Sequence, residues 1–202
     1  MAIGNLHAAF VHPRRVRVIA DHASRLLPRD ARVLDVGTGD GLIAAALAER
    51  RRDVSIEGID VLVRQNTAIP VTPFNGREIP LAAASVDVVT MFDVLHHADD
   101  PAALLAEACR VARTCVVLKD HVANGWLART ILAVMDDVGN RRHGVALPHR
   151  YLSGREWRGV IEQLALTPSV WEVGGLGLYP WPASMVAGGR LHVLARLDKA
   201  AA

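Results

Sequence analysis

The sequence has few cysteines, no long apolar run and no block of charge of one sign. Its two cysteines, Cys109 and Cys115, are not spaced as a CxxC pair. We therefore expect a reduced compartment and a cytoplasmic location, with neither a disulfide framework nor a structural zinc site. No run reaches 18 apolar residues, and no basic segment precedes an apolar one at the N-terminus, so we expect no membrane span and no signal peptide.

The charges are balanced and interspersed, with 23 Lys and Arg against 21 Asp and Glu. No basic stripe stands out, so a small-molecule substrate is expected and a nucleic-acid partner is not. The 202 residues, of which 51% are hydrophobic, are enough for one sizeable core. We expect one domain over residues 1–202. The oligomeric state cannot be inferred from these features.

Apolar strand patterns alternate with helical patterns along the first 120 residues. Such alternation predicts a doubly wound α/β fold with a mostly parallel sheet. The predicted strands are residues 31–36, 54–60, 70–74, 86–92 and 114–120, and the predicted helices are residues 14–27, 41–52 and 101–112.

Residues 120–150 interrupt this rhythm, because they hold one predicted helix, 125–136, and a loop rich in Gly, His and Arg. An excursion of this size is usually functional, and we interpret it as a substrate-side lid. Ser153 and Glu156 predict a capping box for a helix that runs to about residue 166. Segments 168–173 and 190–197 predict two antiparallel strands joined by a long Gly- and Pro-rich loop.

The stretch VLDVGTGDG, residues 33–41, follows the first predicted strand with three alternate glycines. Glycines there let a nucleotide lie against the backbone and the next helix N-terminus. A dinucleotide fingerprint needs a third glycine where Leu42 stands. Asp35 and Asp40 would repel a diphosphate, and the turn holds no Lys or Arg, so the charges favour a cationic donor such as S-adenosylmethionine. Asp60 suits the hydroxyls of a ribose, which both kinds of ligand carry.

These pieces resemble the class I S-adenosylmethionine-dependent methyltransferases, type 11 subgroup. The resemblance rests on VLDVGTGDG, the acid of GID, the stretch at 75–101 and YLSGREW at 151–157. It implies a seven-stranded sheet whose last strand is antiparallel. It also implies cofactor contacts with the methionine half for Asp35, Gly37, Thr38 and Gly39, with the ribose and adenine for Asp60, Val61, Asn75 and Gly76, and near the transferred methyl for Phe92 and Asp93.

Methyl transfer needs a base only when the acceptor must lose a proton. The candidates for catalysis are His97, His121 and Asp120. Other polar residues in the same three segments are Asp93, His96, Lys119, Asp136, Asp137, Asn140 and His143. Structural roles compete with this interpretation. His96 and His97 suit packing at a strand end, Lys119 and Asp120 suit a surface ion pair, and Gly139 suits a helix C-cap.

The aromatic residues and one methionine suggest apolar walls for an acceptor pocket, with ordinary packing as the alternative. They are Trp126, Met135, Trp171, Tyr179 and Trp181. No histidine pair has helical ligand spacing, so we expect no metal site. The sequence thus predicts methyl transfer to a small apolar or aromatic acceptor. A cofactor-binding module without turnover and a nicotinamide-dependent oxidoreductase are the alternatives.

Overall fold

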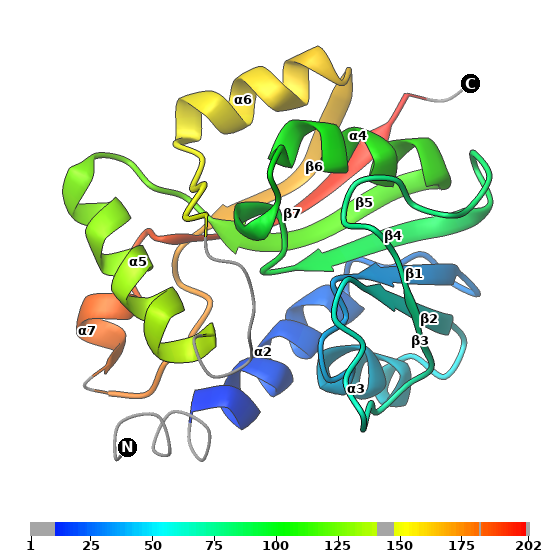
Figure 1. The fold of residues 1–202 in the computed structure, drawn as a ribbon, viewed down its shortest axis with the longest axis horizontal. Helices are drawn as coiled ribbons and strands as arrows, with labels where there is room; N and C mark the ends of the chain where they lie inside the picture. Colours follow the sequence, from blue (N-terminus) through cyan, green and yellow to red (C-terminus); the bar gives the residue numbers. More distant parts are fainter. Residues whose placement is uncertain (1–10, 141–147, 182, 201–202) are drawn as a thin grey trace.

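The computed structural model describes residues 11–140, 148–181 and 183–200, which hold one seven-stranded sheet (Figure 1). Its strands lie in the order β3 (Val71–Pro73), β2 (Ser55–Asp60), β1 (Arg32–Val36), β4 (Val86–Phe92), β5 (Ala112–His121), β7 (His192–Lys199) and β6 (Leu166–Val173). The pairs from β3 to β5 are parallel, and β7 is antiparallel to both β5 and β6. The predicted fold class is confirmed.

Helices cover both faces of the sheet (Figure 1). On one face lie α2 (His12–Ser24) and α3 (Leu42–Arg50), and on the other lie α4 (Pro101–Val111) and α6 (Gly154–Gln163). Each face has its own apolar cluster, one around Ile19 and Leu47 and one around Leu105 and Trp157. Strand β4 is buried along nearly its whole length, as expected for a central strand with both faces covered.

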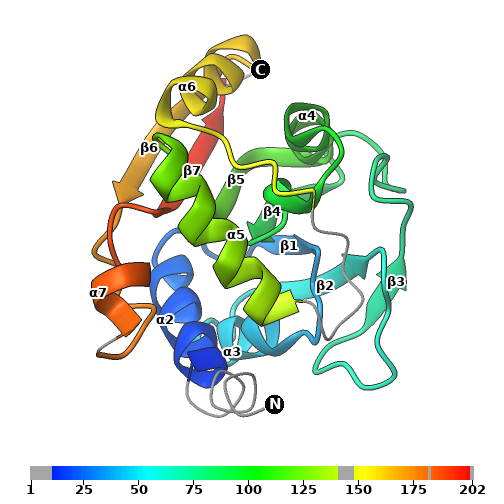
Figure 2. The same ribbon diagram turned by 60° about the vertical axis from the view of Figure 1, so that its left-hand side comes forward.

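The third group of elements lies at the end of the sheet where the parallel strands finish. It comprises η2 (Leu95–His97), α5 (Trp126–Asn140) and α7 (Ala183–Ala187). Both views place α5 and α7 at the end toward which β4 and β5 point (Figures 1 and 2). Ligands of open α/β sheets bind at this end, so the arrangement decides where a site is sought.

Local sequence signals set several boundaries. The capping box at the start of α6 is confirmed, because the Ser153 hydroxyl accepts from the Glu156 backbone and the Glu156 carboxylate accepts from the Ser153 backbone. Several boundaries differ from the predicted ones by a few residues, and one helix was not predicted. Helix α2 ends at Ser24, before the expected residue 27, and α5 continues through Gly139 to Asn140. The last loop, predicted to be irregular, contains α7.

No described helix has the length and apolar character needed to cross a membrane.

Candidate functional site

The turn after β1 is built from residues 37–41, and its three glycines all have positive φ, from +62° to +76°. Side chains other than glycine adopt this conformation at a cost. Gly37 has a second constraint, because a Cβ there would lie 2.4 Å from a methyl of Val94. At Gly39 the nearest atom to an added Cβ is an Arg64 nitrogen at 3.6 Å, an ordinary contact. The turn therefore leaves space beside Gly39 but none at Gly37.

Asp35 lies under this turn and is buried. The Thr90 hydroxyl donates to its carboxylate at 2.6 Å, and the Thr38 hydroxyl donates to its backbone carbonyl at 2.7 Å. Burial, only partly opposed by the hydrogen bonds from Thr90 and Thr38, raises the pKa of Asp35 to about 7. Asp35 is therefore partly protonated at neutral pH, whereas the sequence argument assumed a full negative charge.

This raised pKa predicts a pH-dependent stability. Between its ordinary pKa of 3.8 and about 7, Asp35 keeps its proton in the folded protein and loses it in the unfolded chain. Stability should therefore fall as pH rises through this window, by up to about 4 kcal/mol from this group. Asp35→Asn should remove this part of the pH dependence in urea unfolding at pH values from about 4 to 8. An unchanged pH profile would contradict the raised pKa.

Asp60, at the end of β2, joins the turn to the next loop. One carboxylate oxygen accepts from the Gly39 backbone at 2.7 Å and the other accepts from the Leu62 backbone at 2.8 Å. Each oxygen keeps capacity for a further hydrogen bond. The position thus suits the predicted ribose contact and also organises the turn.

Asp40 is not the isolated acid that its sequence neighbours indicated. His12 lies 3.0 Å from its carboxylate and Arg64 lies 3.6 Å from it. Burial opposes the charge on Asp40, but the hydrogen bond from His12 and the charge of Arg64 lower its pKa. The turn itself holds no Lys or Arg, as the sequence shows, but Arg64 and His12 reach Asp40 from outside the turn.

The predicted adenine contacts lie after the two strands β2 and β3, beyond the turn toward the edge of the sheet. Val61 is exposed, and its methyl lies 2.9 Å from the position of a Cβ at Gly76, which has φ +76°. The Asn75 side-chain oxygen accepts from the backbones of Arg77 and Glu78 at 2.9 and 2.8 Å. This oxygen, expected to accept from the adenine amino group, is thus already used by two donors, and the Asn75 contact stays a prediction.

Phe92 is the last residue of β4, the strand next to the one that leads into the turn, and Asp93 follows it. Phe92 is buried in the α2 and α3 cluster, whereas Asp93 has φ +60° and carries a carboxylate bound by two cations. These cations are Lys119 from β5 and Arg15 from α2. Burial would raise the pKa of Asp93, but Lys119 and Arg15 hold it well below its ordinary value. The proposed surface pair of Lys119 with Asp120 was wrong, because Lys119 is fully buried and pairs with Asp93.

Asp120 lies on the face of β5 opposite to Lys119, and its hydrogen bonds hold η2 in place. Its carboxylate accepts from the Leu95 backbone at 2.9 Å, from His96 Nδ1 at 2.7 Å and from the His121 backbone at 2.7 Å. Burial opposes charge on His96, but Asp120 raises its pKa. Asp120 therefore positions His96, while His97 lies beside it with the two rings 4.0 Å apart.

His121 is the last residue of β5 and lies inside the strand, where a position just after it was expected. It is buried, and its Nδ1 lies 3.2 Å from His192 Nδ1. Its Nε2 lies 3.8 Å from Asp93 and 3.7 Å from Asp136 of α5. Burial, with the nearby charges of His96 and Lys119, lowers the pKa of His121 to about 4. His121 is thus neutral at neutral pH.

Helix α5 covers this polar cluster and contributes Asp136 to it. The Tyr151 hydroxyl donates to Asp136, and His149 Nδ1 lies 2.9 Å from that hydroxyl. Asp136 also lies 3.5 Å from His96 Nε2. Asp137 is more exposed, 3.9 Å from His149. Of the other predicted lid residues, the side chain of Asn140 and all of His143 lie outside the described residues.

Sequence reasoning missed Arg15, Tyr151 and His192 as members of this cluster. All three are distant along the chain from β4 and β5. Tyr151 opens the YLSGREW motif, but that motif indicates only the resemblance and the helix cap, and no local motif marks Arg15 or His192. The sequence holds only a weak indication for Arg15, namely that it is an arginine on the interior face of an amphipathic helix. His192 could be sought as a polar residue at the start of a buried strand.

The expected apolar walls are mostly elsewhere. Trp126 and Trp181 are largely exposed, and Trp171 packs edge-on against Trp157 in the core below α6. Met135 belongs to α5 and packs, partly buried, against the cluster on the α2 and α3 face, and Tyr179 is buried with its hydroxyl accepting from Arg15. Of the five, only Met135 and Tyr179 lie near the polar cluster, so ordinary packing or exposure explains the others.

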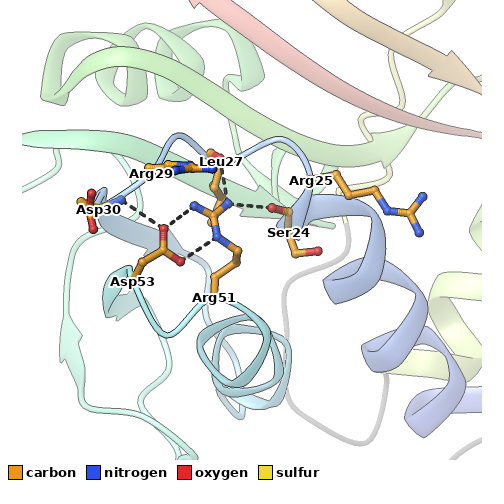
Figure 3. A pocket seen from close by; sticks show the side chains of 7 residues that line it. All are labelled: Ser24, Arg25, Leu27, Arg29, Asp30, Arg51 and Asp53. Atoms are coloured by element: carbon orange, nitrogen blue, oxygen red, sulfur yellow. Dashed lines mark hydrogen bonds and ion pairs between the residues drawn. The ribbon is translucent and has the colours of Figure 1, made fainter.

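A hollow of about 540 Å³ lies at the opposite end of the sheet (Figure 3). It is lined by residues that precede β1 and β2, among them Asp30 and Asp53. The Arg51 guanidinium spends its donors on Asp53 and on the backbone carbonyls of Ser24, Leu27 and Pro28. The donors of Arg51 are therefore used by the fold. The candidate site lies at the other end of the sheet, which carries the glycine turn and the polar cluster.

Comparison with known proteins shows the family to which the chain belongs. Residues 10–163 match the family described as "Methyltransferase domain". The chain is 32% identical over 118 residues to the ubiquinone biosynthesis O-methyltransferase of Hahella chejuensis, an alignment that covers 51% of this chain and 46% of that protein. It is 28% identical over 176 residues to the dimethylglycine N-methyltransferase of Parasynechococcus marenigrum, covering 79% and 59%.

A solved S-adenosylmethionine-dependent methyltransferase of Thermotoga maritima has the same fold, with a TM-score of 0.67 and 18% identity over 94% of this chain and 92% of that one. The chain spans about half the length of the curated relatives it matches.

Proposed function

Because the chain belongs to the S-adenosylmethionine-dependent methyltransferases, we propose that it transfers a methyl group from S-adenosylmethionine to a hydroxyl of a small apolar or aromatic acceptor. The observation that carries the proposal is the adjacency of two features. The glycine turn with Asp60 lies at the carboxyl ends of β1 and β2, and a buried polar cluster lies at the ends of β4 and β5. The glycine turn suits a nucleoside, and the polar cluster suits a polar acceptor group.

The residues of the turn fit the cofactor. The atoms nearest to a Cβ added at Gly39 belong to the flexible Arg64 side chain, which can give way to a ligand against the backbone. The remaining capacity of the Asp60 oxygens suits the ribose hydroxyls. Asp35 lies beneath the turn, where a cationic group would favour its ionised form. Bound S-adenosylmethionine supplies an activated methyl on a sulfonium, so the chain has to align the acceptor and exclude water.

The polar cluster supplies the acceptor side. Neutral His121 has an Nε2 that can accept a hydroxyl proton, and the carboxylates of Asp93 and Asp136 would stabilise the imidazolium that results. Asp120 acts through His96, as a positioning residue. His97 stays a candidate beside them. Helix α5 covers the acceptor site as a lid in this proposal, because its Asp136 lies 3.7 Å from His121 in the cluster. Residues 141–147 of the predicted lid lie outside the described residues.

The proposal is tested first by binding and turnover. S-adenosylmethionine should raise the melting temperature, whereas NAD should not. Labelled methyl transfer should then be found with phenols or catechols, and less with amines of similar size. Binding of S-adenosylmethionine without transfer to any acceptor would favour the alternative of a binding module without turnover. Stabilisation by NAD alone would contradict the proposal.

Asp60→Ala should weaken S-adenosylmethionine binding by about 2 kcal/mol, because charged hydrogen bonds to the ribose would be lost. Isothermal titration calorimetry measures this change. Glu57→Ala on the same strand is the matched control, since Glu57 is exposed and pairs with Arg32 at the surface. Equal affinities for the Asp60 and Glu57 variants would remove Asp60 from the ribose site.

His121→Ala should lower turnover by about 100-fold, within the range attributed to proton transfer by a positioned group. The affinity for S-adenosylmethionine should stay near wild type, because His121 lies on the acceptor side. His22→Ala on α2 is the control for loss of a histidine. A wild-type rate in a folded His121→Ala protein would exclude His121 as the base.

A further inference from the structure

We infer that His96, His121 and Asp93 form a binding site for a divalent transition-metal ion, with the Asp136 carboxylate beside it. Ligand atoms of His96, His121 and Asp93 all lie within 4.8 Å of one another. The sequence argument against a metal looked for two histidines on one helix. Here the donors come from η2, from β5 and from the residue after β4, an arrangement that the search for a helical pair did not cover.

The hydrogen bonds orient both imidazoles toward the same point. His192 Nε2 lies 2.9 Å from the Ala187 carbonyl, which only accepts, so His192 Nε2 carries the proton and its Nδ1 accepts. His121 Nδ1 must then donate to His192, which leaves the lone pair on His121 Nε2. In the same way, His96 Nδ1 donates to Asp120, so Nε2 is the His96 nitrogen that is left for an ion.

This is the arrangement of ligands that bind metals. A histidine that binds a metal through one nitrogen usually donates the other N–H to a carboxylate, carbonyl or similar acceptor, which fixes its tautomer and ring orientation. Asp120 has this role for His96, and His192, itself fixed by the Ala187 carbonyl, has it for His121. Asp120 and His192 therefore act as positioning residues.

A second observation points to a ligand at this place. Within the part of the chain that the structure describes, the buried His96 Nε2 makes no hydrogen bond. His96 is only 2% exposed, so water does not readily satisfy this nitrogen. Such a buried polar atom is costly unless something binds it. Its nearest charged neighbour is the Asp136 carboxylate, at 3.5 Å.

The distances between donors suit one ion. His96 Nε2 and His121 Nε2 lie 3.5 and 3.7 Å from oxygens of Asp136, and His121 Nε2 lies 3.8 Å from Asp93. Donors around a tetrahedral ion with bonds of about 2.1 Å are separated by roughly 3.4 Å. Small side-chain movements would therefore bring these atoms into coordination distance.

The charges also favour a cation. Three carboxylates, those of Asp93, Asp120 and Asp136, lie in this cluster with Arg15 and Lys119, of which Lys119 touches Asp93. A bound ion would displace any proton on His96 and would take its place beside the Asp136 carboxylate. A mixed nitrogen and oxygen donor set suits Zn²⁺ or a similar ion better than Mg²⁺, which prefers oxygen. A bound ion would occupy the His121 Nε2 lone pair, so it would replace His121 in promoting ionisation of an acceptor hydroxyl; this role alone rests on the proposed function.

Metal titration of the full chain, without cofactor or acceptor, tests the site. The protein is first stripped with a chelator and dialysed, then titrated with Zn²⁺ against a chromophoric competitor. Co²⁺ is titrated separately and its visible spectrum recorded. We expect one ion per chain and a Co²⁺ spectrum typical of tetrahedral nitrogen and oxygen ligands. Since no methyl transfer is measured, failure of the site and failure of the proposed function are distinguished.

Variants then test the donors. His96→Gln and His121→Gln should each weaken Zn²⁺ binding at least 100-fold, and Asp120→Asn should weaken it about 10- to 100-fold through the orientation of His96. His22→Gln, on the surface of α2, should bind as wild type. Absence of a stoichiometric ion in the wild type would overturn the inference. So would equal affinity in folded His96→Gln and His121→Gln. If a histidine variant does not fold, the test is made with Asp136→Asn and the wild-type Co²⁺ spectrum. Weaker Zn²⁺ binding by Asp136→Asn and a tetrahedral spectrum would support the site, and unchanged binding without such a spectrum would overturn it.

Discussion

Gly37→Val should abolish binding of S-adenosylmethionine and destabilise the fold. The residue has φ +71°, which costs a β-branched side chain about 1–2 kcal/mol. A Cβ at this position would also lie 2.4 Å from Val94 Cγ2, and overpacking of this kind costs about 1–3 kcal/mol. Relief requires that β1 and the segment after β4 separate, which distorts the turn against which the nucleoside lies. Calorimetric titration and thermal unfolding measure the two effects.

Two further variants separate backbone strain from the clash. Gly39→Ala has a similar positive φ, +62°, but only an ordinary contact with Arg64, so it should lose stability and keep measurable binding. Gly37→Ala should bind more weakly than Gly39→Ala, and combining Gly37→Ala with Val94→Ala should recover part of the difference. Normal affinity in Gly37→Val would mean that the cofactor does not use this turn.

Asp93→Ala should destabilise the protein by about 3–5 kcal/mol. Asp93 neutralises Arg15 and buried Lys119, and loss of one member of a buried ion pair leaves an uncompensated charge. Asp93 also follows β4 with φ +60°, but that strain is small beside the loss of both pairs. Urea unfolding at neutral pH measures the change in the free energy of unfolding.

The controls use a surface pair and a compensating change. Asp99→Ala removes a carboxylate that pairs with Arg77 where both side chains are more than 70% exposed, so its effect should be within about 0.5 kcal/mol of zero. Asp93→Ala combined with Lys119→Met should be more stable than Asp93→Ala alone, because the unpaired ammonium is gone. A small effect of Asp93→Ala would mean that Lys119 and Arg15 find other partners.

Much of the fold could be predicted from the sequence, because its signals are local. The predicted strand at 86–92 coincides with β4, since a run of Val, Thr, Met and Phe has to be buried on both faces. The Ser153 and Glu156 capping box likewise acts within one turn. The errors occurred where a local signal was overridden. Gly139 suggested the end of a helix, yet α5 continues past it, and a loop rich in Gly and Pro contains α7.

The site was harder to predict, because its charges are set by tertiary contacts. The glycine turn and Asp60 could be located from one motif each. The partners of Lys119, Asp40 and His121 could not, because Asp93, His12 and His192 lie 26, 28 and 71 positions away in the chain. A protonation state such as that of Asp35 depends on burial, which a strand-end aspartate does not reveal in the sequence. Membership of the family is confirmed, whereas the acceptor stays a proposal.

The position of β7 has a consequence during synthesis on the ribosome. Strand β5 pairs with β4 soon after both have emerged, but its other edge pairs only with β7, the last strand to be made. Until then β5 exposes unpaired backbone groups, and such an edge invites association between nascent chains. A translation product that stops before residue 192 should therefore aggregate, however well its first half has folded.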